Sequence, residues 1–86
     1  MKLSYDDEAD AIYVYAQEDG SVARSEILED GRVVDLDADG RLIGVEILDA
    51  SSMGVRLADL ADRFDLGERR AGLEALERLF RSTAPA

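Results

Sequence analysis

The dipeptide Asp-Gly occurs three times in the first half of the chain, at residues 19–20, 30–31 and 39–40. Asp-Gly between alternating apolar residues is a strong signal for a two-residue hairpin, because both central positions of a type I′ turn need a positive φ. The segments between the dipeptides are short and rich in Ile, Val and Tyr, as β-strands are. This spacing predicts a series of antiparallel hairpins over residues 1–50.

Two-residue turns also fix the register, because each turn decides which residues of neighbouring strands face each other. On this basis one face of the sheet collects the aliphatic residues Ile12, Val14, Ile27, Val34, Leu36, Ile43, Val45 and Ile47. Residues 2–5 form a first strand that joins through an acidic turn at residues 6–9. We therefore expect a five-stranded antiparallel β-meander with one apolar face. The opposite face is expected to be acidic and to carry Tyr13, Tyr15, Leu28, Leu42 and Glu46.

The hydrophobic period changes in the second half of the chain. A first helical stripe consists of Leu57, Leu60, Ala61 and Phe64. A second stripe follows an interruption and consists of Leu73, Leu76, Leu79 and Phe80. We expect a single α+β domain, residues 1–86, in which one or two helices from residues 51–86 cover the apolar face of the sheet. The second helix is predicted from about residue 68 to 81, and its stripe belongs either to the core or to a contact with a partner, such as a second copy.

The net charge of −10 lies entirely in the first half of the chain. Residues 1–50 contain four basic and fourteen acidic residues, whereas residues 51–86 contain six of each. An acidic domain repels nucleic acid and anionic membranes and attracts a basic partner. The chain lacks cysteine, a membrane-span pattern and a signal-peptide pattern, so we expect a cytoplasmic protein. A chain of 86 residues has a marginal core, which favours a homo-oligomer, most simply a dimer.

The stretch DLDADGRLIGVE, residues 35–46, has the ligand spacing of an EF-hand calcium loop. Its acidic residues Asp35, Asp37, Asp39 and Glu46 stand at positions 1, 3, 5 and 12 of such a loop. An EF-hand needs a helix on each side, but the residues on both sides are glycine and β-branched residues, which favour strands. We therefore favour a hairpin and keep divalent-cation binding by these four carboxylates as an alternative.

The composition argues against catalysis. The chain has no His and no Cys, which excludes His-based triads, thiol nucleophiles and the usual zinc sites. Asp6, Glu8 and Asp10 in the acidic turn leave a small carboxylate-based enzyme or ligand carrier as a further alternative. We expect a non-enzymatic protein–protein interaction module without a cofactor. Its candidate interface residues are Tyr13, Tyr15, Leu28, Leu42 and Glu46 on the sheet and Leu73, Leu76, Leu79 and Phe80 on the second helix.

Two stretches carry a family resemblance. KLSYDDEADAIYVY is similar to a Tyr-Asp-x-Glu-Ala-Asp-Ala-x-Tyr opening, and VVDLDADGRLIGVEILDAS to an Asp-Gly-x-x-x-Gly-Ile-Glu-Ile-Leu-x-Ala-Ser ending, with Val45 in place of the first isoleucine. Together, over residues 2–51, they resemble the uncharacterised bacterial family called domain of unknown function 2283. The resemblance implies a compact sheet protein without an established activity. It also implies an antitoxin-like role beside a basic toxin, because members resemble the smaller partner of suspected toxin–antitoxin gene pairs.

Overall fold

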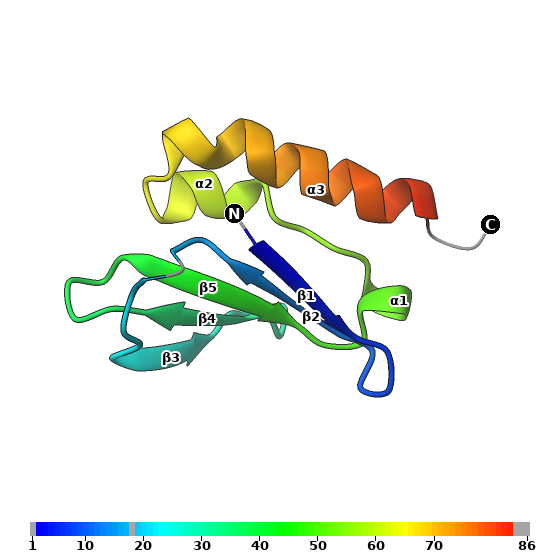
Figure 1. Cartoon of the computed structure of the whole chain (residues 1–86), viewed down its shortest axis with the longest axis horizontal. Helices are drawn as coiled ribbons and strands as arrows, with labels where there is room; N and C mark the ends of the chain where they lie inside the picture. Colours follow the sequence, from blue (N-terminus) through cyan, green and yellow to red (C-terminus); the bar gives the residue numbers. More distant parts are fainter. Residues whose placement is uncertain (1, 18, 84–86) are drawn as a thin grey trace. The chain divides into compact units, whose positions relative to one another are not determined.

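The structure, a computed structural model, describes residues 2–17 and 19–83 (Figure 1). Its sheet consists of β1 (Lys2–Asp6), β2 (Ala11–Tyr15), β3 (Arg24–Ile27), β4 (Val33–Leu36) and β5 (Leu42–Ile47). Neighbouring strands are antiparallel, and their order is β1-β2-β5-β4-β3. The five-stranded antiparallel sheet, the C-terminal helices and the α+β class are therefore confirmed. The chain divides into a sheet unit, Met1–Ala50, and a helical unit, Ser51–Ala86.

The strand order differs from the predicted meander at one place. β2 pairs with β5, through Ile12 opposite Ile47 and Val14 opposite Val45, and not with β3. The predicted turn at residues 19–20 is therefore wrong. The physical reason is apolar contact, since β5 offers β2 the aliphatic partners Ile47 and Val45, whereas β3, with the sequence RSEI, contains one aliphatic residue.

The described residues of the connection from β2 to β3 contact both strands of the β4–β5 hairpin. At the β2 side, the backbone N–H groups of Ala16 and Gln17 both donate to the carbonyl oxygen of Ile43, at 2.8 and 3.1 Å. At the β3 side, the N–H of Ala23 donates to the carbonyl oxygen of Leu36 at 2.8 Å. Strands β3, β4 and β5 are connected by hairpins, and β2, which precedes them in the chain, lies beside β5, the last of the three. Strands β2 to β5 thus form a Greek key.

The other two Asp-Gly dipeptides lie in hairpin turns, but each loop has three residues where two were predicted. The N–H of Leu28 donates to the carbonyl oxygen of Arg32 at 2.7 Å, and that of Asp37 donates to Arg41 at 2.9 Å. Gly31, the last loop residue before Arg32, has a φ of 94°. This is the common three-residue hairpin loop, in which a tight turn is followed by a glycine in the left-handed region.

The extra loop residue reverses the faces of β3. Ile27 pairs with Val33, whereas the two-residue turn predicted Val34 as its partner. A shift of one residue moves every side chain of a strand to the other face. Ile27, predicted for the core, is therefore 77% exposed, and Leu28, predicted for the outer face, is buried.

The loop of the β4–β5 hairpin also has one residue more than predicted, but a β-bulge restores the predicted register beyond the turn. Next to the turn, Leu36 pairs with Leu42 and not with the predicted Ile43. Ile43 is the extra residue of the bulge, beyond which Val34 pairs with Val45 as predicted. Leu42 was predicted for the outer face, but it is buried because the bulge turns it toward the side of Leu36.

The helical unit follows the predicted stripes. After the sheet the chain forms α1 (Ala50–Met53), which begins at the last residue of the sheet unit, and then α2 (Asp59–Arg63), η1 (Gly67–Arg69) and α3 (Arg70–Thr83). A second helix was predicted over residues 68–81 and is confirmed as α3, while α1 was not predicted. The interruption between the stripes coincides with Asp65, whose φ is 56°. That the helices cover the apolar face of the sheet stays a prediction.

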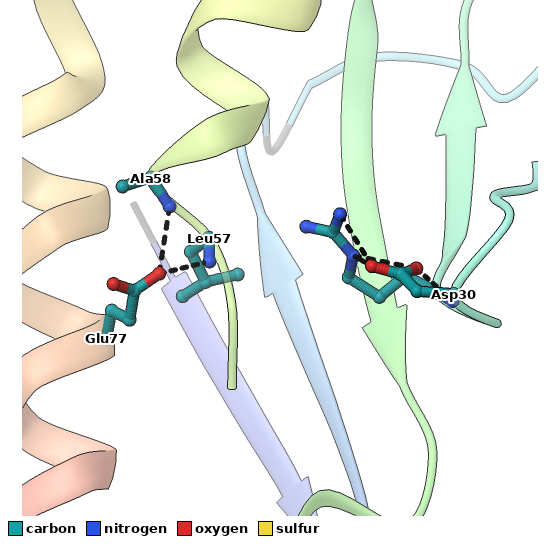
Figure 2. A network of polar contacts seen from close by, with 5 residues as sticks. Asp30, Leu57, Ala58 and Glu77 are labelled. Atoms are coloured by element: carbon teal, nitrogen blue, oxygen red, sulfur yellow. Dashed lines mark hydrogen bonds and ion pairs between the residues drawn. The ribbon is translucent and has the colours of Figure 1, made fainter. Parts of the chain in front are cut away.

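A carboxylate from α3 holds the start of α2. One oxygen of Glu77, Oε1, accepts hydrogen bonds from the backbone N–H groups of Leu57 and Ala58, at 2.7 and 3.2 Å (Figure 2). Ala58 stands at the N-cap position and makes no side-chain cap. Glu77 therefore satisfies the free backbone donors that a helix start leaves unpaired.

Candidate functional site

The outer face of the sheet is the face opposite its buried aliphatic residues, and two rows of residues cross it. The strand register gives the first row as Lys2, Tyr15, Gly44, Asp35 and Ser25. It gives the second row as Ser4, Tyr13, Glu46, Val33 and Ile27. Each row takes one residue from every strand, so the outer face brings together side chains that are far apart in the sequence.

Tyr13 lies across the central strand of this face. Its side chain starts on β2, passes over Gly44 of β5 and donates a hydrogen bond of 2.6 Å from its hydroxyl to Oδ2 of Asp35 on β4. A Cβ atom built on Gly44 would lie 2.6 Å from both Cε1 and Cζ of the tyrosine ring. A glycine at position 44 is therefore what allows the ring to lie so close to the backbone of β5.

Asp35 joins the tyrosine to the edge strand. Its second oxygen, Oδ1, accepts a hydrogen bond of 2.5 Å from the hydroxyl of Ser25 on β3. Hydroxyl donors to a carboxylate make short, charge-assisted bonds. Tyr13, Asp35 and Ser25 thus form one hydrogen-bonded chain across β2, β4 and β3, and this chain fixes the position of the tyrosine ring.

The same contacts keep the Tyr13 hydroxyl protonated. Burial raises the pKa of Tyr13 above its ordinary value of 10.0, and the hydrogen bond to the Asp35 carboxylate raises it further. An ionised hydroxyl would lose hydration and would face a carboxylate of the same sign. Tyr13 therefore keeps its proton to a higher pH than an ordinary tyrosine and donates a hydrogen bond to Asp35.

Tyr15 extends this aromatic surface. Its ring centroid lies 4.5 Å from that of Tyr13, with the rings tilted by 60°. The ammonium nitrogen of Lys2 lies 5.6 Å from the Tyr15 ring centroid, which is within the range of a cation–π interaction. The outer face thus presents two neighbouring aromatic rings, one of which already attracts a cation.

The predicted interface residues fall into two groups. Tyr13, Tyr15 and Glu46 do lie together on the outer face. Leu28 and Leu42 do not, because both are buried for the reasons of register given above. On the helical unit Leu73 is buried, Leu76 and Phe80 are half-buried, and Leu79 is 53% exposed. The role of these nine residues in an interface stays a prediction.

Sequence reasoning missed Ser25 and Gly44 as members of the outer face. A two-residue turn at residues 30–31 would pair Ser25 with Leu36 and put it on the apolar face, whereas the observed three-residue loop pairs it with Asp35 on the outer face. Gly44 had a usable signal, since a glycine inside a strand often marks the close approach of another group. The partner of that approach, Tyr13, is 31 residues away in the sequence, so the approaching group could not be identified from the local pattern.

The candidate calcium loop is the preferred hairpin and not an EF-hand, while divalent-cation binding by its carboxylates stays a prediction. The candidate loop is flanked by strands β4 and β5, where an EF-hand needs helices. Asp35 is held by Tyr13 and Ser25, while Oδ1 of Asp37 accepts the N–H groups of Asp39 and Arg41, each at 2.9 Å. Within residues 2–17 and 19–83, no three His, Cys, Asp or Glu side chains are grouped so that they could hold a metal ion.

The acidic turn between β1 and β2 uses its carboxylates for local structure. Oδ1 of Asp6 accepts the N–H groups of Glu8 and Ala9 at 3.1 and 3.3 Å. Asp10 accepts the hydroxyl of Tyr5 at 3.2 Å. These contacts are typical of aspartates that stabilise a turn, and they give no support to the carboxylate-based enzyme or carrier considered above.

The two stretches that carry the family resemblance meet in the fold. Strand β2 from the first stretch lies beside β5 from the second, and the carbonyl oxygen of Asp10 accepts the N–H of Ala50 at 2.9 Å. The site and fold thus define a small α+β protein built on an antiparallel Greek-key sheet. A family model described as a protein of unknown function, DUF2283, matches residues 2–51, which is more than half of the chain. The protein belongs to this family.

The remaining comparisons are negative. No curated protein and no solved structure matches the chain. Within the part of the chain that the structure describes, no helix combines the length and apolar composition needed to cross a membrane.

Proposed function

We propose that the protein is a non-enzymatic binding module whose outer face holds a basic segment of a protein partner. The observation that carries the proposal is the chain of hydrogen bonds from Tyr13 through Asp35 to Ser25, which fixes an aromatic ring over Gly44 on the sheet. A ring that is already fixed loses little conformational entropy when a partner packs on it. Tyrosines of this kind are common anchors in protein interfaces.

The charge of the sheet unit supports a basic partner. The first fifty residues carry a net charge of −10, and Asp35 and Glu46 lie on the outer face itself. Complementary charge steers association and fixes the orientation of a partner. Lys2 beside Tyr15 illustrates the chemistry, since an arginine or lysine of a partner on this ring would gain about 0.5–1 kcal/mol at an exposed site.

The local chemistry favours binding over catalysis. Both oxygens of Asp35 already accept hydrogen bonds, and Tyr13 keeps its proton for the reasons given above. The chain also has no His or Cys that could act as nucleophile or general base near neutral pH. An antitoxin-like role in the bacterial cytoplasm, in which the outer face masks a basic toxin, is the specific form of this proposal that the family resemblance suggests.

A matched pair of charge reversals tests the proposal. Glu46→Lys changes the outer face, whereas Glu68→Lys makes the same change of charge at an exposed position of η1 in the helical unit. Wild-type protein and both variants are used as bait in lysate of the native cells, and the recovered partner is then titrated by calorimetry. We expect Glu46→Lys to weaken the partner by about tenfold or more, because it places like charges in contact, and Glu68→Lys to bind as wild type does. Equal binding by the two variants, or a recovered partner without a basic segment, would contradict the proposal.

A further inference from the structure

We propose that strand β3 pairs with β3 of a second copy, so that the two sheets join into one continuous antiparallel sheet. β3 lies at one end of the strand order, beside β4. All four of its residues are exposed, and Ile27 is 77% exposed. An edge strand presents backbone donors and acceptors that another strand can pair with, and an exposed isoleucine adds apolar area to such a contact.

The sequence of β3 is complementary to itself. In an antiparallel pair centred on Ser25, each Arg24 lies opposite Glu26 of the other copy, and each Ile27 lies opposite Ala23. The two charged side chains point to the same face, where Nε of Arg24 and Oε2 of Glu26 already form an ion pair of 2.9 Å within one chain. Both remain about half exposed, at 52% and 50%. Two copies can therefore exchange their two intrachain ion pairs, one in each copy, for two equivalent pairs across a two-fold axis.

The opposite edge has a similar pattern but different contacts. On β1, Lys2 and Asp6 lie at equal distances from Ser4. The Lys2 ammonium, however, lies over the Tyr15 ring, and Asp6 accepts two backbone N–H groups of the acidic turn. Pairing through β1 would disturb both arrangements. Strand β3 is therefore the favoured edge.

Pairing through β3 has a consequence for the outer face. Because the strands of the two copies would continue one sheet, the two outer faces would lie side by side, with both Ser25 side chains at the axis. The hydrogen-bonded chains that begin at Tyr13 would then meet at the centre of a ten-stranded sheet, since each copy contributes five strands. Pairing through β3 is independent of the proposed function, because it concerns the edge of the sheet and not a foreign partner.

Cysteine cross-linking tests the predicted axis directly, because the chain has no cysteine of its own. Residues directly opposite in an antiparallel pair have Cα atoms about 4.5–5.5 Å apart, which is within the range of a disulfide. We expect Ser25→Cys to form a disulfide-linked dimer under mild oxidation, and Ser4→Cys, the matched control at the centre of β1, to remain monomeric. A dimer with Ser4→Cys, or none with Ser25→Cys, would overturn the assignment.

Charge reversal provides a second test that does not alter Ser25. Arg24→Glu places like charges across both symmetric contacts, and the double variant Arg24→Glu/Glu26→Arg restores opposite charges. By sedimentation velocity over a range of concentrations, we expect the dissociation constant of the dimer to rise about tenfold in the single variant and to return to within about twofold of wild type in the double variant. Circular dichroism confirms that each variant is folded. A wild-type chain that stays monomeric at millimolar concentration, or a double variant as weak as the single one, would refute the pairing.

Discussion

Glycine is needed at two kinds of position in the sheet unit, for different physical reasons. The first kind is the hairpin turn, and the second is the crossing point, where a side chain from elsewhere in the sequence lies directly against the glycine backbone. At the turns, Gly31 and Gly40 have φ values of 94° and 81°, which other residues adopt only at a cost. At the crossing points, the place of a Cβ atom is taken by another side chain, which is Ile43 at Gly20 and Tyr13 at Gly44. Turn glycines decide how the chain reverses, whereas crossing glycines decide what can lie against it.

This difference explains why one Asp-Gly dipeptide was assigned incorrectly. Residues 19–20 have the same letters as the two turns, but Gly20 is needed where the connection from β2 to β3 passes against Ile43. The sequence shows that position 20 is glycine, but it does not show whether the glycine is needed for a turn or for the close approach of another side chain. The outer face depends on the same kind of position, since Gly44 makes room for Tyr13.

The largest effect is expected from Gly44→Ala. The added methyl group would meet the Tyr13 ring, which cannot move away without losing its bond to Asp35. We expect the free energy of unfolding to fall by about 3 kcal/mol, at the upper end of the range for overpacking. Urea unfolding followed by circular dichroism gives this value.

A double-mutant cycle shows whether the tyrosine ring is the cause. In a Tyr13→Ala background the space above residue 44 is open, so Gly44→Ala should cost less than about 1 kcal/mol. The same cost in both backgrounds would mean that position 44 needs glycine for its backbone and not for the approach of Tyr13.

The sequence predicts local features of this fold better than its pairings. Alternation correctly identifies five strands and buries Ile12, Val14, Val34 and Val45, because the period of two is a property of each strand alone. The choice of β5 as the partner of β2 depends on burial between distant segments. Asp-Gly also suits both two-residue and three-residue hairpin loops, and the difference of one residue moved Leu28 to the core.

The candidate site shows the same limit. Tyr13, Tyr15 and Glu46 lie on the outer face as predicted, because the alternation of side chains along their own strands is enough to place them there. Ser25 does not, since its face depends on the length of a turn. The bond between Tyr13 and Asp35 spans three neighbouring strands, and so it depends on a strand order that alternation does not specify.

A smaller effect is expected from Gly20→Ala at the crossing connection. The atom nearest to the added methyl group would be Cδ1 of Ile43, the end of a side chain that is itself buried. We expect a loss of about 1–2 kcal/mol. Ile43→Val removes that Cδ1 atom, so the same substitution in an Ile43→Val background should cost about half as much or less. An unchanged cost would show that Gly20 is needed for its own backbone conformation, and the distinction between turn and crossing glycines would fail at this position.

The smallest effect is expected at a turn, and it separates the two kinds of glycine most cleanly. A Cβ atom on Gly31 would meet nothing within 4 Å, so the cost of a substitution there comes from its φ alone. Gly31→Ala should lower the free energy of unfolding by about 1 kcal/mol, and Gly31→Asn by less, because asparagine tolerates the left-handed region. At Gly44 the order should reverse, with asparagine costing more than alanine, since the larger side chain meets Tyr13. Thermal and urea unfolding of these four variants measures the two orders. The same order at both positions would mean that one property of glycine, and not two, accounts for the turns and the crossings.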